Sequence, residues 1–199
     1  GFLGKNAVKG YLAMVEFAVR HLGDLEDEYV TINEPNVYAV CGYLGAGFPP
    51  GEFNISHALR VMKVMGECHR RAYRLIHNIH KELGYAEPKV GLAMHMRAFV
   101  PYNAKNLWHR IACRISEYNF QTKLNKTYML GPEGPYADFL GLNYYARTAT
   151  SGLGDGTLPN VPVNDLGWEI YPAGIVECCQ KLHAILPELP IYITENGTA

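Results

Sequence analysis

The 199-residue chain has no excess of charge of either sign, and charged residues of any kind are scarce. Eighteen lysines and arginines stand against 19 aspartates and glutamates, and only 19% of the residues are charged. Nucleic acids and anionic membranes are bound through concentrated fields of lysine and arginine. The composition therefore predicts neither a nucleic-acid partner nor a membrane partner.

Cysteine is also sparse, and its pattern excludes two common uses. The five cysteines include no Cys-x-x-Cys pair and show no spacing with histidine that is typical of a metal site. An odd number of cysteines fits a reducing compartment better than a disulfide framework. No apolar run has the length of a membrane span, and no signal peptide is visible after Gly1. We therefore expect a cytoplasmic protein without a metal site.

Hydrophobic residues make up 48% of the chain. Along the sequence, short runs typical of strands alternate with segments in which the hydrophobic residues have helical spacing. Short β-rich runs predict four strands: "EYVTINEP", "KVGLAMHMRAF", "ADFLGLNYY" and "IYIT". Helical spacing predicts helices near 6–22, 56–83 and 104–127 and one after Pro172, with a glycine-rich loop over 36–54. Buried strands that alternate with helices predict a parallel sheet. No linker divides the chain, so residues 1–199 are expected to form a single domain.

Two architectures fit this alternation, an open doubly wound sheet and a (β/α) barrel. Polar or aromatic residues lie at the C-terminal end of each predicted strand, namely Asn33-Glu34, His95, Asn143-Tyr144-Tyr145 and Glu195. In a barrel these ends converge on one mouth, where the chemistry is placed. No glycine-rich phosphate loop follows any strand, which argues against a nucleotide-binding sheet. The sequence therefore favours the barrel.

Two glutamates at strand ends are candidates for catalysis. Pro35 favours an extended backbone at Glu34, so the first strand should continue outward through it. Pro35 also offers no N–H to the Glu34 carboxylate, whereas Asn196 and Gly197 can donate hydrogen bonds to Glu195. Carboxyls in such different surroundings can serve as acid and nucleophile in glycoside cleavage. The alternative is that each glutamate is a solvated charge at the end of a strand.

Four stretches resemble, in order, the motifs of the family 1 glycoside hydrolases, the β-glucosidase family. They are "TINEPNVYAVCGYLGAGFPPG", "DFLGLNYYAR", "GWEIYP" and "IYITENG". The Asn-Glu-Pro triplet is shared by a wider superfamily of glycosidase barrels, but the four stretches together cover nearly the whole chain. The resemblance implies a (β/α)8 barrel of the TIM type that hydrolyses β-glycosides with retention of configuration and without a cofactor.

The resemblance also implies roles for five residues. Glu34 matches the acid/base on the fourth barrel strand, and Glu195 matches the nucleophile on the seventh. Asn33 matches the residue that hydrogen-bonds the sugar 2-hydroxyl. Tyr145 matches the tyrosine that holds the nucleophile, and Asn143 lines the same pocket. The implied substrate is a β-glucoside or a related oligosaccharide.

The resemblance covers only the fourth to seventh of the family's eight strands. The chain is therefore expected to be a partial barrel domain that lacks most of the residues reading the sugar, so glucose, galactose and 6-phosphosugars all stay open. Four strands cannot close a barrel, and we expect self-association through the open edges. Catalysis is expected to need the missing segments.

Other readings stay open at this stage. The chain could be a truncated relative that acts as a binding or interaction module, or an endo-glucanase of the same superfamily. His77 and His80 are more typical of a helix surface than of a metal pair. Tyr38, Tyr43 and Phe48 are candidates to border an aglycone site.

Overall fold

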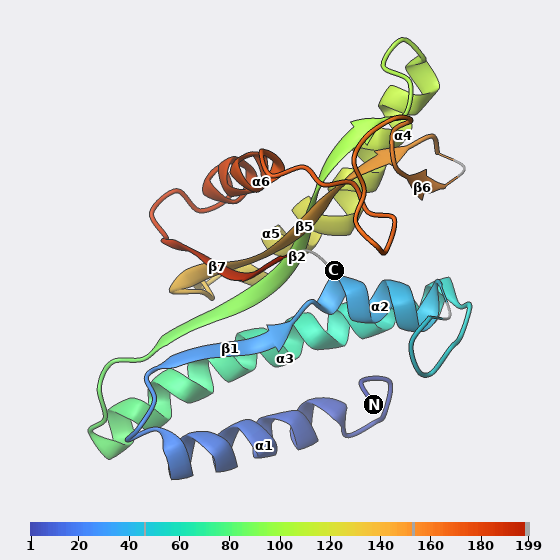
Figure 1. Ribbon diagram of the computed structural model, residues 1–199. Coiled ribbons are helices and arrows are strands. Elements are labelled where there is room, and N and C mark those ends of the chain that lie inside the picture. Colours follow the sequence, from blue (N-terminus) through green and yellow to red (C-terminus); the bar gives the residue numbers. More distant parts are fainter. Residues whose placement is uncertain (46, 153, 198–199) are drawn as a thin grey trace. The chain divides into compact units, whose positions relative to one another are not determined.

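The computed structural model describes residues 1–45, 47–152 and 154–197, and the chain divides into two compact units (Figure 1). Unit 1 comprises Gly1–Met94 and Thr127–Gly141, and unit 2 comprises His95–Lys126 and Leu142–Ala199. Two long strands, β2 (Lys89–Pro101) and β5 (Phe139–Thr150), begin in unit 1 and end in unit 2. A single partial-barrel domain over residues 1–199 stays a prediction.

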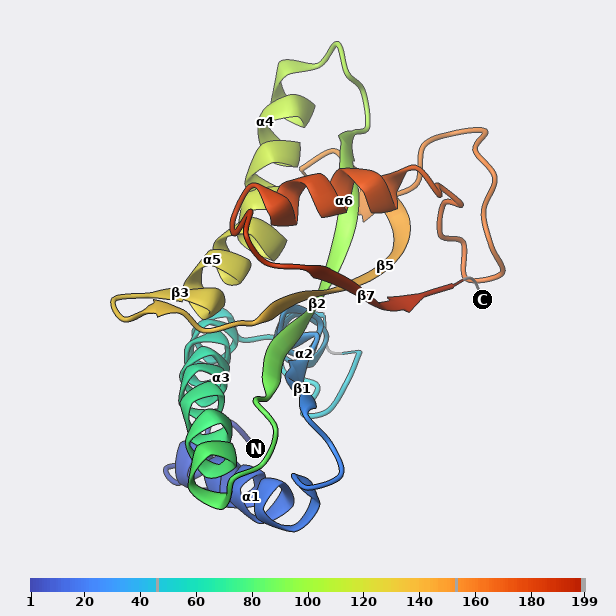
Figure 2. The ribbon, with the colours of Figure 1, turned by 90° about the vertical axis from the view of Figure 1, so that its left-hand side faces the viewer.

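Unit 1 is built around a long helix. Its elements are α1 (Ala7–Leu22), β1 (Glu28–Asn33), α2 (Pro35–Tyr43), α3 (Ile55–Leu83), the first part of β2, and the short hairpin of β3 (Leu130–Gly131) and β4 (Gly134–Pro135). Helix α3 contacts α1, α2 and β1, and both ribbon views show α1 lying alongside α3 (Figure 2). Their shared core consists of Val15, Val19, Ala72, Ile76, Ile79 and Val90. The helices predicted near 6–22 and 56–83 are therefore present as α1 and α3.

Strands β1 and β2 pair in parallel, as predicted. Glu28 lies opposite Lys89 and Val30 opposite Gly91, and the register then shifts before Asn33 pairs with Ala93. Strand β2 is buried from Val90 to Met96, which agrees with its near-continuous apolar sequence. In unit 1 the backbone of β5 closes on β2 at Gly141, where a Cβ would lie 2.7 Å from the Leu92 carbonyl oxygen. Glycine permits this close approach.

Unit 2 completes the two long strands and adds helices and two further strands. Its elements are α4 (Leu107–Glu117), the π-helical turn η1 (Tyr118–Thr122), β6 (Asp155–Gly156), α6 (Gly174–His183) and β7 (Ile191–Asn196), and α5 (Lys123–Met129) runs from unit 2 into unit 1. The sheet has the order β1-β2-β5-β6, and β7 pairs with β5. Helix α6 contacts β7 (Figure 2). Its buried residues Gly174, Cys178 and Leu182 recur at intervals of four, as expected for one helical face. Burial raises the pKa of Cys178 to about 12.

The predicted loop over 36–54 is wrong at its beginning, because α2 occupies Pro35–Tyr43. Proline is well suited to the first position of a helix, where its missing N–H is not needed. Gly42 suggested a loop but lies in this helix, where a Cβ would come within 3.3 Å of the Pro49 carbonyl oxygen. The glycine serves close packing there and not a turn.

Glu34 does not continue the strand, so the extended backbone predicted for it is also wrong. Its dihedral angles are φ 46° and ψ 56°, the left-handed region, which costs a non-glycine residue about 1–2 kcal/mol. The Glu34 N–H donates to the Ala93 carbonyl at 2.8 Å, and its carbonyl accepts from the Tyr38 N–H at 3.0 Å. The chain thus changes from strand to helix within one residue, and these two hydrogen bonds hold the strained turn.

The two histidines considered as a metal pair have separate structural partners. His80 Nδ1 donates to the Ala86 carbonyl at 2.6 Å, and His77 Nε2 lies 2.9 Å from the Asp138 carboxylate. Residues 1–45, 47–152 and 154–197 contain no group of three or more His, Cys, Asp or Glu side chains that could hold a metal ion. Within the same ranges no helix has both the length and the apolar character needed to cross a membrane.

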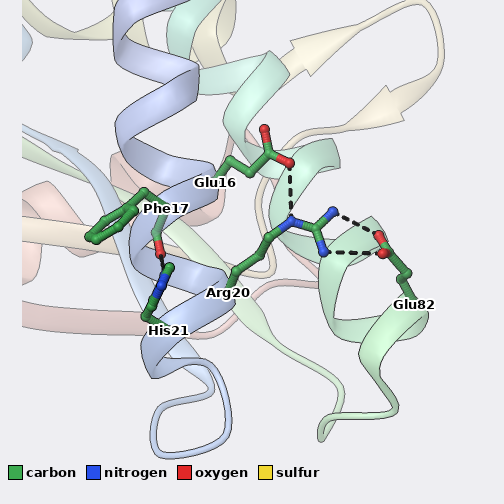
Figure 3. A network of polar contacts seen from close by, with 5 residues as sticks. All are labelled: Glu16, Phe17, Arg20, His21 and Glu82. Carbon is green, nitrogen blue, oxygen red and sulfur yellow. Dashed lines mark hydrogen bonds and ion pairs between the residues drawn. The ribbon is translucent and has the colours of Figure 1, made fainter.

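An exposed ion-pair network links the ends of α1 and α3 (Figure 3). Arg20 binds Glu16 through Nε at 3.0 Å and Glu82 through both terminal nitrogens at 3.1 and 2.9 Å. These hydrogen bonds raise the pKa of Arg20, and the bond from Arg20 lowers the pKa of Glu82. Solvent-exposed pairs of this kind contribute little to stability.

Asp138, by contrast, receives three hydrogen bonds in a half-buried site of unit 1. Tyr73 Oη donates at 2.8 Å, the Val90 N–H at 2.8 Å and His77 Nε2 at 2.9 Å. Burial alone would raise the pKa of Asp138, but the donors outweigh it and lower the pKa below its usual 3.8. The carboxylate therefore ties α3 to the strands β2 and β5.

We expect Asp138→Asn to lower the free energy of unfolding by about 2 kcal/mol at neutral pH, because three donors lose a charged acceptor. A group with a lowered pKa in the folded state stabilises above its unfolded pKa and loses that contribution as the pH falls. The difference between parent and variant should therefore shrink below pH 3.8. Urea denaturation at several pH values measures it. The control is Glu82→Gln, which should leave stability unchanged; equal effects would contradict the assignment.

Candidate active site

The candidate residues divide between the two units. Asn33 ends β1 and Glu34 follows it in unit 1, whereas Asn143, Tyr145 and Glu195 lie in unit 2. Glu195 is the penultimate residue of β7. The strand ends predicted near His95 and Asn143 are wrong, since β2 continues to Pro101 and β5 to Thr150. Both strands extend beyond the predicted ends because hydrogen bonds still form there. The N–H of Tyr102, the residue after β2, donates to the carbonyl of Thr150, the last residue of β5.

Unit 2 brings Tyr145 and Glu195 into direct contact. Tyr145 Oη donates to Glu195 Oε2 at 2.7 Å, although the residues are 50 positions apart in the chain. They lie on the neighbouring strands β5 and β7. A short hydrogen bond to one carboxylate oxygen orients the group, because the bond weakens when the lone pair of that oxygen turns away from the donor.

Asn143 is fully buried beside this contact. Its Oδ1 accepts a hydrogen bond of 2.5 Å from Thr194 Oγ1 on β7. The side-chain amide of Asn196 donates to the Tyr144 carbonyl at 2.7 Å. The turn residue Asn196 therefore ties β7 to β5. The donor to Glu195 described above is Tyr145, which lies on the neighbouring strand β5. The turn sequence Asn196-Gly197 could not indicate this donor.

Two aromatic residues surround the Tyr145 ring. His95 stacks on it with ring centroids 5.9 Å apart and an interplanar angle of 21°, and Trp168 meets it edge to face at 6.1 Å. Arg97 Nε donates to His95 Nε2 at 3.0 Å, so that ring nitrogen acts as the acceptor. Gln121 is buried and fixes the backbone of Arg97 at both its N–H and its carbonyl. The ring of Tyr145 is thus held by neighbours that are themselves anchored.

A cavity of about 270 Å³ opens beside Tyr145 within unit 2. Its lining includes His95, Arg97, Tyr145, Arg147, Asp155 and Trp168. The first three come from long strands and the last from the loop before α6. Aromatic faces next to charged groups are suited to sugars and to polar aglycones.

Sequence reasoning missed Trp168 and Asp155 as lining residues. Trp168 lies in the quoted stretch "GWEIYP", and a tryptophan in a loop rich in glycine and proline was the available signal. Of the aromatic residues considered for an aglycone border, Tyr43 is 3% exposed and belongs to the core of unit 1. Phe48 is 52% exposed, and Tyr38 packs against Phe2 and Tyr43.

Comparison with known sequences gives a consistent family. The glycosyl hydrolase family 1 profile matches residues 1–131. The β-galactosidase of Saccharolobus solfataricus is 29% identical across 100% of this chain and 45% of its own length. β-Glucosidase A of Thermotoga maritima is 26% identical across 90% of this chain and 46% of its own length. The chain thus spans about half the length of these curated relatives.

Solved structures match the fold along the whole chain. A β-glycosidase from Pyrococcus horikoshii superposes with a TM-score of 0.86 at 26% identity, covering 100% of this chain and 49% of the other. The hyperthermophilic β-glucosidase from Pyrococcus furiosus gives 0.78 at 31% identity, covering 43% of that chain. The predicted TIM-type (β/α)8 fold, of which this chain holds about half, is confirmed. The profile match over most of the sequence shows that the chain belongs to glycosyl hydrolase family 1.

Proposed function

We propose that this chain carries both catalytic carboxyls of a retaining β-glycosidase, with Glu195 as nucleophile and Glu34 as acid/base. The observation that carries the proposal is the hydrogen bond from Tyr145 to Glu195. It leaves one carboxylate oxygen oriented by a phenol at the end of a strand, next to a cavity with aromatic walls. Membership of the family and relatives named β-glucosidase and β-galactosidase support the reaction class.

In this mechanism Glu195 attacks the anomeric carbon while Glu34 gives its proton to the departing glycosidic oxygen. The covalent glycosyl ester at Glu195 is then hydrolysed by a water molecule that Glu34 deprotonates, which restores both groups and retains the configuration. Tyr145 holds the attacking carboxylate in one orientation. The reaction needs only two carboxyls and water, so we propose no cofactor.

The asparagines supply sugar contacts in this proposal. Asn33 directly precedes Glu34 and would hydrogen-bond the 2-hydroxyl of the sugar, a contact that strengthens in the transition state. Asn143 is held by Thr194 and would line the pocket beside Glu195. The strained backbone at Glu34 supports a functional role, because such residues concentrate at active sites. The substrate class is a β-glucoside or a related oligosaccharide.

The proposed location and partners rest on the state of the cysteines and on the balance of charged residues. All five cysteines are free thiols, which suits the reducing conditions of the cytoplasm. The acidic and basic residues are balanced, which supports the absence of nucleic-acid and anionic-membrane partners. Since the chain spans about half of its relatives, we also propose that turnover requires the remaining barrel segments.

We expect Glu195→Gln to lower kcat/KM at least about a thousandfold in any form of the protein that turns over, because an amide cannot act as nucleophile. An aryl-glucoside assay measures the loss, and mass spectrometry after incubation with a 2-deoxy-2-fluoro glycoside should locate the label on Glu195. Glu188→Gln, an exposed residue of the same unit, is the control. A label on Glu34, or parental rates in the variant, would overturn the assignment.

We expect Glu34→Ala to slow substrates with poor leaving groups far more than activated aryl glycosides, because only the former require a proton in the transition state. Azide should restore part of the rate by occupying the space of the lost carboxylate, and the product should be the β-glycosyl azide. Chromatography with NMR identifies the anomer. An α-azide would mean inversion and would exclude the mechanism.

The chain on its own is expected to form dimers or larger assemblies and to lack detectable aryl-glucosidase activity. Strand β1 lies at the end of the strand order, and open strand edges pair with other chains. Light scattering on the purified chain, with an activity assay before and after adding the complementary barrel segments, tests this. A stable and active monomer would contradict it. Sugar binding without turnover in the completed barrel would favour a binding module, and internal cleavage of a glucan would favour an endo-glucanase.

A further inference from the structure

An ion pair between Arg147 and the buried Glu169 lies beside the cavity in unit 2, and Arg147 is one of the residues that line this cavity. Arg147 on β5 donates from Nε to Glu169 Oε2 at 3.0 Å and makes a second bond from its terminal nitrogen to the other carboxylate oxygen. The Glu169 side chain is 2% exposed and that of Arg147 21%. Hydrogen bonding to Glu169 raises the pKa of Arg147, which keeps the guanidinium charged. This two-pronged contact fixes direction as well as distance.

The segment that carries Glu169 has little regular structure of its own. Asn164 closes a tight turn, since its Oδ1 accepts from the N–H groups of Leu166 and Trp168 and its own N–H donates to the Trp168 carbonyl. The Ile170 N–H donates to the Pro162 carbonyl. The turn is therefore internally bonded, and it needs an attachment to the sheet if Trp168 is to have a defined place.

Arg147 provides that attachment. Its backbone forms an antiparallel bridge with Glu169, its side chain binds the Glu169 carboxylate, and its guanidinium lies 4.0 Å from the ring centroid of Tyr171. A further contact to the same strand comes from Tyr144, whose hydroxyl donates to the Tyr171 carbonyl at 2.5 Å. The loop is thus attached to β5 at two positions, Glu169 and Tyr171.

This attachment sets the position of Trp168 relative to Tyr145. Trp168 directly precedes Glu169 and is 42% exposed, with its ring edge-to-face on Tyr145 at 6.1 Å and an angle of 65°. Tyr145 and Arg147 are two residues apart on β5, so their side chains project from the same face of the strand. Strand β5 therefore carries both Tyr145, whose phenol binds Glu195, and Arg147, whose guanidinium binds Glu169 next to Trp168.

We propose that Arg147 and Glu169 are a positioning pair, which fixes Trp168 against Tyr145 and thereby the orientation of the Glu195 carboxylate. The catalytic part of this inference rests on the proposed role of Glu195 as nucleophile. Neither member of the pair acts on the reacting atoms. Two apolar residues could fill the same volume without loss of stability. The planar guanidinium of Arg147 instead makes two hydrogen bonds to the Glu169 carboxylate and so fixes the angle between the two groups. Lysine cannot make this contact and is therefore not equivalent to Arg147.

The first test reads Trp168 directly and needs no catalysis. The sequence has two tryptophans, so Trp108→Phe leaves Trp168 as the only indole. In this background Arg147→Lys and Glu169→Gln should shift the emission to the red and raise the acrylamide quenching constant. Glu117→Gln is the matched control, because it breaks the 2.6 Å ion pair with Lys181 in the same unit. Unchanged emission in both variants, or an equal change in the control, would overturn the proposal.

A double variant, Arg147→Met with Glu169→Leu, guards against simple misfolding. It removes both charges, so no buried charge is left without a partner. The expected result is a parental far-UV circular dichroism spectrum and unfolding midpoint, together with the higher quenching of Trp168. Parental quenching in this variant would show that apolar packing alone positions Trp168 and would refute the role of the ion pair.

The second test uses an active form of the protein. Arg147→Lys should lower kcat by about 10- to 100-fold with a smaller change in KM, since a displaced catalytic group costs that order. In a Tyr145→Phe background the same substitution should have little further effect on kcat, because the pair acts through Tyr145. Additive losses would overturn the proposed route. If no form turns over, the proposed function fails, while the quenching comparison still decides whether the pair positions Trp168.

Discussion

Burial of β2 constrains the rest of the structure. Every residue from Val90 to Met96 is buried, so this strand can be stable only with cover on both of its faces and a bonded neighbour along each edge. Parallel pairing with β1 and adjacency to β5 meet the second requirement. From Val90 to Met94 the strand carries no polar side chain, and its polar residues His95 and Arg97 come after this run. A site that draws polar groups from β2 must therefore use the part of the strand that begins at His95.

The site residues follow from this constraint. Glu34 directly follows β1 in unit 1, and Glu195 is the penultimate residue of β7 in unit 2. Tyr145 and Asn143 lie within β5, the strand next to β7. A neighbouring strand holds each residue, Glu34 at its backbone, where Ala93 accepts from its N–H, and Glu195 at its carboxylate, to which Tyr145 donates. A group held from a neighbouring element keeps its place because the two strands cannot move independently. The proposed displacement at a sugar carbon would require such fixed positions.

Ion pairs in this chain illustrate how burial changes the role of the same chemistry. The Arg20 network between α1 and α3 lies in solvent and contributes little. The pair of Arg147 and Glu169 is buried, so breaking it would leave a charge without compensation. Only the buried pair can impose a single geometry on a loop, and it lies next to the aromatic residues that line the cavity. Position in the fold, and not the type of contact, decides what such a pair can do.

The local sequence was sufficient for the elements that depend on local patterns. Apolar runs located β1, β2, β5 and β7, and helical spacing located α1 and α3, because burial and periodicity are written along the chain. The four motifs led to the family, and they also named Tyr145 and Glu195 as neighbours. That pairing came from the resemblance, since no feature of residues 50 positions apart predicts a hydrogen bond.

Tertiary structure alone decided the features that depend on a neighbour elsewhere in the chain. Gly42 lies in helix α2 with the Pro49 carbonyl packed against it, and hydrogen bonds to Ala93 and Tyr38 hold the left-handed backbone of Glu34. Arg147 meets Glu169 across a loop without regular spacing. Sequence by itself determined which segments are buried and which residue types lie at strand ends. The angles and partners of those residues were set by packing, because a contact between distant segments exists only once the sheet has brought them together.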